Sequence, residues 1–171
     1  FRGGPVELSR LLTDLTRKDR IRFANLLLAM PEDIDSMYFA AVLDGMSGHG
    51  ANTPADQLEA EKESLALVPT DLFEQVIQRL HRLADHPCGT SICDCIQRLS
   101  DRVLPDELFE ILVYYATEDP DPFEDHEPNQ GRHAFAGDPH AHGINSVRGQ
   151  AAEAIASLLH EHGALSLWDF A

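Results

Sequence analysis

Apolar residues recur at spacings of three and four along most of the chain, with polar residues between them. This period is close to one turn of an α-helix, so each such segment predicts a helix with one buried face. The pattern predicts two helices within 5–30 that break near Lys18, followed by helices over 32–43, 69–85, 90–103, 105–116 and 144–163. The predicted fold class is therefore all-α.

The residues of each apolar stripe are the side chains that we expect to pack against a neighbouring helix. The first predicted helix carries the stripe Val6, Leu8, Leu11, Leu12 and Leu15. The helix over 90–103 carries the stripe Ile92, Cys95, Ile96, Leu99 and Val103.

The helix over 144–163 carries the stripe Val147, Ala151, Ile155, Leu158 and Leu159. Several alanines add little bulk to this helix, which allows a neighbouring helix to approach closely. Asn145 is placed to cap its start, and Gly163 is placed to end it.

Arg148 falls in the first turn of that helix, where the helix dipole disfavours a cation. We expect an acid of the preceding loop, Asp119, Asp121 or Glu124, to pair with it and so fold the loop onto the helix start. The alternative is a contact between Arg148 and an anion or a partner at the helix N-terminus.

Two segments lack the helical period. Residues 51–67 form a polar, acidic connector with room for a short helix around 57–64, and residues 118–143 form a long loop rich in Pro, Gly, His and acidic residues. A loop of this length in a compact chain is usually functional or disordered. The expected organisation is a single helical domain over 1–171 with these two interruptions.

A short motif repeats along the chain. Residues 68–74 match residues 104–110 at an offset of 36, with Pro, Leu, Phe and Glu identical, and residues 30–34 are a weaker copy. Each period has room for two antiparallel helices, and stacked helix pairs share one core. The repeat therefore predicts an α-solenoid. Independent helix starts are the alternative, because Pro followed by an acid is common at helix N-termini.

Three stretches carry a family resemblance: RFANLLLAMPEDIDSMYFAAVLDGM, YYATEDPDP and GINSVRGQAAEAIASLL. They resemble the HEAT-like helical arrays of very large bacterial ATPases, including the STAND-type proteins of phage defence. The resemblance covers most of the chain apart from the connector, and its most specific piece is 143–152. It implies that the array is a sensor or scaffold and that a separate nucleotide-binding domain hydrolyses ATP. The chain itself has no phosphate loop of the G-x-x-x-x-G-K-S/T type.

Charge is distributed unevenly over the 171 residues. The formal net charge is -16, yet residues 1–30 hold six basic and three acidic side chains. A strongly acidic surface repels nucleic acid and suits a protein partner with a basic surface. The alternative is that the acidic side chains only keep the chain in solution.

Three clustered cysteines make no disulfide framework, and no apolar run approaches the length of a membrane span, so we expect a soluble, cytoplasmic protein. The abrupt start at Phe1 suggests a piece of a larger multidomain protein.

The loop over 118–143 holds the residues expected to bind a partner. Phe123 and Phe135 are the expected apolar anchors, and Asp125, His133, His140 and His142 are the expected polar contacts. The loop histidines and carboxylates also suit a divalent transition metal, so a metal-dependent enzyme is an alternative.

A zinc site is the other metal alternative. His81, His86, Cys88, Cys93 and Cys95 mix imidazole and thiolate ligands within a short span. Their spacing disfavours a closed site, because Cys93 and Cys95 fall on nearly opposite faces of a helix. We therefore expect no metal, no cofactor and no catalytic residue in this chain.

These observations favour a non-catalytic scaffold or sensor module that binds protein partners and contacts neighbouring domains of the same protein. A purely architectural spacer is the main alternative. Polar faces with an apolar surface at both ends of the array would favour the spacer.

Overall fold

The computed structural model describes residues 4–48, 63–120 and 146–161, and within these ranges every regular element is a helix, so the all-α prediction is confirmed there. No helix in these ranges has the length and apolar character needed to cross a membrane. Residues 63–66, at the end of the predicted connector, are also helical. The helices are α1 (Pro5–Lys18), α2 (Arg20–Ala29), α3 (Ser36–Ser47), α5 (Thr70–His81), α6 (Gly89–Arg98), α7 (Asp106–Thr117) and α9 (Val147–Glu161).

Short polar residues set the boundaries of the first three helices. The predicted break near Lys18 occurs at Asp19, whose side chain accepts a hydrogen bond from the Arg22 amide and caps α2. Helix α3 begins four residues later than predicted, because Asp35 accepts a hydrogen bond from the Met37 amide and caps it there. It also runs past its predicted end at residue 43 and stops at Gly48, whose φ of 78° is left-handed.

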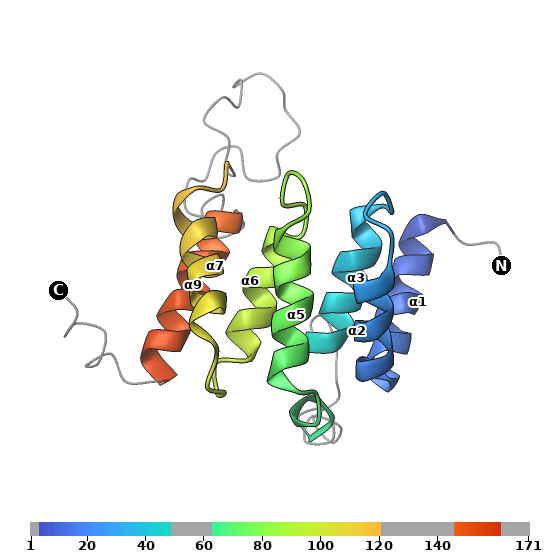
Figure 1. The fold of residues 1–171 in the computed structure, drawn as a ribbon, viewed down its shortest axis with the longest axis horizontal. Helices are drawn as coiled ribbons and strands as arrows, with labels where there is room; N and C mark the ends of the chain where they lie inside the picture. Colours follow the sequence, from blue (N-terminus) through green and yellow to red (C-terminus); the bar gives the residue numbers. More distant parts are fainter. Residues whose placement is uncertain (1–3, 49–62, 121–145, 162–171) are drawn as a thin grey trace.

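The helices form two rows (Figure 1). Helices α2, α5 and α7 pack side by side in one row, α3, α6 and α9 form the second row behind them, and α1 packs on α3 at one end. Most of the fully buried side chains belong to one continuous apolar cluster between the rows. Its largest members include Leu27, Phe39, Phe73, Ile77, Ile92, Leu108 and Tyr115.

The strong repeat in the sequence corresponds to two equivalent helices. Helices α5 and α7 each have 12 residues, each follows a proline of nearly identical backbone angles, and they pack in the same row. The weaker copy does not correspond to a third such helix. Pro31 precedes α3, which lies in the other row, so this part of the repeat prediction is wrong.

The first helix buries a different face from the one predicted. Of the predicted stripe, Val6, Leu8, Leu11 and Leu15 are 39–48% exposed and Leu12 packs against the core, whereas Thr16 is fully buried against α3. The cause is that α1 and α3 cross closely at Gly45, which has no side chain. A Cβ atom added at Gly45 would lie 2.6 Å from the Cβ atom of Thr16. Thr13 adds a hydrogen bond from its hydroxyl to the Ala41 carbonyl oxygen, at 3.0 Å. Small and polar side chains therefore make the closest part of the α1–α3 contact.

Arginine side chains tie the connections between helices to the main chain. Each donates hydrogen bonds to carbonyl oxygens at the end of a distant helix or turn. The pairs are Arg20 with Met46 at 3.0 Å, Arg79 with Met30, and Arg102 with Leu65 and Val68 at 2.6 and 2.8 Å. A charged donor satisfies such carbonyl groups strongly.

Arg102 explains why a predicted stripe ends early. Helix α6 ends at Arg98, and Arg102 turns toward the segment before α5. Val103 was expected to be buried with the α6 stripe but is 90% exposed. Because these hydrogen bonds hold Arg102 against the segment before α5, the neighbouring Val103 lies outside the core.

Helix α9 begins at Val147, so Ser146 occupies the capping position that the sequence analysis assigned to Asn145. The Ser146 hydroxyl accepts a hydrogen bond from the Gly149 amide at 3.0 Å. Arg148 reaches the start of the predicted loop, where its Nε donates to the main-chain carbonyl oxygen of Asp119 at 2.5 Å, whereas the sequence predicted a pair with a side-chain carboxylate. Asn145 and Gly163 themselves lie outside the described residues.

Candidate functional site: a cleft between two equivalent helices

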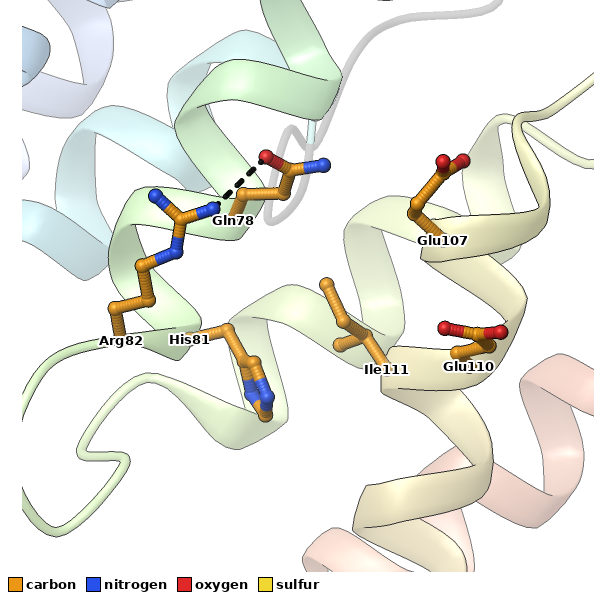
Figure 2. Close-up of a pocket in the computed structure, with 6 residues that line it drawn as sticks. All are labelled: Gln78, His81, Arg82, Glu107, Glu110 and Ile111. Atoms are coloured by element: carbon orange, nitrogen blue, oxygen red, sulfur yellow. Dashed lines mark hydrogen bonds between the residues drawn. The ribbon is translucent and has the colours of Figure 1, made fainter.

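A cleft of about 260 Å³ separates the outer faces of α5 and α7. Figure 2 shows the residues of α5 on one wall and those of α7 on the facing wall. The lining consists of Gln78, His81 and Arg82 at the end of α5 and Glu107, Glu110 and Ile111 on α7. The cleft therefore lies between the two helices that begin with the repeated motif.

The helical period places these residues at the cleft. On α5, Leu72, Phe73, Val76, Ile77 and Leu80 are the buried positions, which leaves Gln78 and Arg82 on the outer side. On α7 the buried stripe includes Ile111, whose side chain is 7% exposed and lies at the base of an otherwise polar cleft. The walls are therefore polar and the base is apolar.

The two walls differ in charge. On α5, Arg82 Nη2 donates to Gln78 Oε1 at 3.4 Å, and Gln78 Nε2 donates to Glu74 Oε1 at 2.9 Å, so the side chains form a chain along the helix. On α7, Glu107 and Glu110 lie one turn apart and are both solvent-exposed. The cleft thus offers hydrogen-bonding and cationic groups on one side and two carboxylates on the other.

An aromatic cluster closes one end of the cleft. The His81 ring stacks on the His86 ring with centroids 4.8 Å apart, and the Tyr114 ring meets His81 edge-on at 4.9 Å. His81 Nδ1 lies 3.3 Å from the Tyr115 hydroxyl. Burial lowers the pKa of His81 below its usual value, with smaller contributions from His86 and Arg82. His81 is therefore neutral at pH 7.

The turn after α5 positions His86. Asp85 and His86 both have left-handed backbones, with φ of 61° and 45°, which is strained for residues with side chains. His86 Nδ1 lies 2.6 Å from the His81 carbonyl oxygen, and this contact holds the turn. This contact and the strained turn accompany the stacking of the His86 ring on His81.

The candidate zinc ligands are divided between this cluster and the core. Cys88, Cys93 and Cys95 are all buried. Burial is the main cause that raises the thiol pKa of Cys88 and of Cys93 to about 12 and raises that of Cys95 further. Protonated thiols are poor metal ligands and poor nucleophiles. In the part of the chain that the structure describes, no three histidine, cysteine or acidic residues gather as metal ligands would.

The predicted partner-binding residues, Phe123, Asp125, His133, Phe135, His140 and His142, all lie outside the described residues. The cleft residues were not predicted from the sequence. A signal for them was present, because Glu107 and Glu110 match Asp71 and Glu74 at the offset of 36. Exposed acidic residues on a helix usually indicate only a solvated face, so this pattern alone does not predict a binding site.

Comparison with known proteins does not assign this cleft to a family. No protein-family model matches the chain, and no curated protein or solved structure matches it. The functional assignment therefore depends on the geometry of the described residues.

Proposed function

We propose that this chain is a non-catalytic helical-repeat module that binds a protein partner, acting as a scaffold or sensor. The observation that carries the proposal is the α5–α7 cleft, in which polar and charged side chains of two equivalent helices lie around Ile111. Shape and charge complementarity, without a chemical step, are sufficient for such a site to function. The three buried, protonated thiols support a non-catalytic role.

A HEAT-like solenoid is the architecture that we propose for the module. The two rows of helices support it, as does the offset of 36 between the starts of α5 and α7. In such an array successive helix pairs stack on one continuous core, and the grooves between pairs face the solvent. The α5–α7 cleft is one of these grooves.

The partner that fits the cleft is an extended segment carrying Lys or Arg. A basic side chain placed between α5 and α7 would meet the carboxylates of Glu107 and Glu110, while Gln78 and Arg82 would hydrogen-bond to main-chain carbonyl groups of the segment. The net charge of -16 would attract a basic partner over distance and repel nucleic acid. The loop residues predicted from the sequence, including Phe123 and Phe135, would extend this surface.

The wider setting is part of the same proposal. The resemblance to HEAT-like arrays of STAND-type bacterial ATPases supports a cytoplasmic role in antiviral defence, in which neighbouring domains of a larger protein hydrolyse ATP. In that setting the array would detect or hold a protein ligand. The full reading frame would test this context directly, because it would contain a phosphate-loop domain.

The cleft is tested with labelled nine-residue peptides of Gly and Ser that carry two Lys, two Arg or two Glu residues. We expect the Lys and Arg peptides to bind, and we expect the double variant Glu107→Gln/Glu110→Gln to bind them about tenfold more weakly, since two charge-assisted contacts are lost. Its unfolding free energy should change by less than about 0.5 kcal/mol, because both side chains are exposed. Fluorescence anisotropy gives the affinity, and denaturant titration gives the stability.

The matched control is Glu32→Gln/Asp33→Asn, which removes the same charge from the turn between α2 and α3. If this control weakened binding as much as the cleft variant, attraction by the general acidic surface would explain the result. If no basic peptide bound to the wild-type chain, the assignment of the cleft as a binding site would be wrong.

An architectural spacer is the second candidate, because apolar side chains are exposed toward both ends of the described array. Leu8, Leu11 and Leu15 are exposed on α1 at one end, and Val103 and Val113 are exposed near the other. A spacer needs such surfaces to join its neighbours. Absence of peptide binding together with concentration-dependent self-association that Leu11→Glu abolishes would favour this function over the first.

A further inference from the structure

A second and larger hollow lies on a different side of α7. It has a volume of about 460 Å³ and is lined mainly by apolar side chains. Val103, Leu104 and Pro105 come from the segment before α7, Phe109 comes from α7 itself, and Leu158 comes from α9. Two acidic residues of α7, Asp106 and Glu110, complete the lining. Glu110 also lines the α5–α7 cleft, but this hollow has the larger number of apolar lining residues.

The lining of this hollow is unfavourable in water. Val103 is 90% exposed, while Phe109 is only partly buried although it packs against the core cluster. Apolar area of this kind gains free energy when another apolar group covers it, in proportion to the area removed from water. The hollow is therefore a docking surface for an apolar segment.

We propose that residues 164–171 of the same chain, ALSLWDFA, cover this hollow. Helix α9 ends at Glu161, one turn beyond Leu158, so the chain leaves α9 beside the hollow. The ten residues that follow span up to about 3.3 Å each when extended, which is ample to reach Val103 and Phe109. Four of the last eight are large and apolar: Leu165, Leu167, Trp168 and Phe170.

Tethering favours this segment over a second copy of the protein. The exposed leucine face of α1 in another molecule is the other apolar surface that would fit the hollow. A short tether gives its segment an effective concentration of about a millimolar, whereas another molecule is present at the micromolar concentrations of an ordinary experiment. The tethered segment therefore occupies the hollow first. This inference is independent of whether the α5–α7 cleft binds a partner.

Trp168 makes the proposal measurable, because it is the only tryptophan of the chain. In the wild-type chain we expect its fluorescence to be blue-shifted relative to N-acetyl-tryptophanamide and to be shielded from quenching by acrylamide. Val103→Glu places a carboxylate in the hollow without removing a core side chain, and Phe109→Ser removes the apolar lining. Each variant should red-shift the emission and raise the quenching constant by about twofold or more, because an unpaired charge or polar group opposes apolar docking.

Val6→Glu is the matched control, since it adds the same charge at an exposed valine of α1, at the far end of the array. It should leave the emission of Trp168 unchanged, and circular dichroism should show the same helix content in all four proteins. Wild-type emission equal to that of the free compound would overturn the proposal. A blue shift that both hollow variants retain would also overturn it, because the segment would then lie elsewhere. A shift that is lost on dilution would overturn the proposal as well, because the segment would then dock on another molecule instead of its own.

Discussion

The contact between α1 and α3 and the contact between α5 and α7 are built from different side chains, and the second borders a cleft. At α1–α3 the glycine Gly45 lets the helices cross closely, with Thr13 and Thr16 filling the contact. At α5–α7 the helices meet through larger side chains such as Ile111, and their outer turns stand apart around a cleft. Close helix crossing at α1–α3 thus makes a tight structural joint, whereas the contact between α5 and α7 borders an open cleft.

The α1–α3 joint is most sensitive to an added side chain. Gly45→Ala should lower the free energy of unfolding by about 1–2 kcal/mol and Gly45→Val by about 3 kcal/mol, because the new atoms overpack a tight contact. A Cβ atom there would lie 2.6 Å from the Thr16 Cβ atom and 2.7 Å from the Thr13 carbonyl oxygen. Denaturant titration measures the change.

Ala29→Val is the control for that series, because Ala29 is exposed at the end of α2. It should change the unfolding free energy by less than about 0.5 kcal/mol. Tolerance of Gly45→Val would show that the close crossing is not needed, and the contrast with α5–α7 would then disappear.

Arg102 ties the connection before α7 to the segment before α5, and its loss should have the next largest effect. Its guanidinium group donates to the Leu65 and Val68 carbonyl oxygens and lies 5.5 Å from the centroid of the Phe73 ring. Arg102→Ala should lower the unfolding free energy by about 2 kcal/mol, because two carbonyl groups lose a charged donor and a cation–π contact is lost.

Arg98→Ala is a matched control for Arg102→Ala. Arg98 pairs with Asp94 at 2.8 Å, and its side chain is 42% exposed. Such a surface ion pair contributes about 0–1 kcal/mol, so this variant should be much less destabilised. Equal losses in the two arginine variants, measured by thermal unfolding, would show that the carbonyl contacts of Arg102 have no special role.

The smallest expected effect is a pH dependence at the α5–α7 cleft. Because burial lowers the pKa of His81 in the folded chain, the unfolded chain takes up the proton first as the pH falls below about 6.5. His81 therefore contributes a loss of stability as the pH falls from 7 to 5. His81→Gln should reduce that slope, whereas the exposed-site variant His160→Gln should retain it. An unchanged slope in His81→Gln would show that the aromatic cluster does not disfavour a charged imidazole.

Much of the helical structure follows from the sequence alone. The spacing of apolar residues located α5 and α7, and the prolines at 69 and 105 marked their equivalent starts. The break before α2 was also predictable, because Asp19 caps the helix locally. These features depend on residues within one or two turns of each other, and the sequence displays that local information directly.

The candidate site and the buried faces were decided by the tertiary structure. The leucine stripe of α1 has the periodicity of a buried face, yet most of it is exposed. Gly45, which is distant in the sequence, lets the face of α1 that carries Thr16 pack against α3. Val103 fits the α6 stripe, yet it is exposed. The neighbouring Arg102 donates to a carbonyl oxygen in the segment before α5, and Val103 therefore does not enter the core. Periodicity shows which faces of a helix are apolar, but only the approach of distant helices determines which of those faces are covered and where a cleft remains between them.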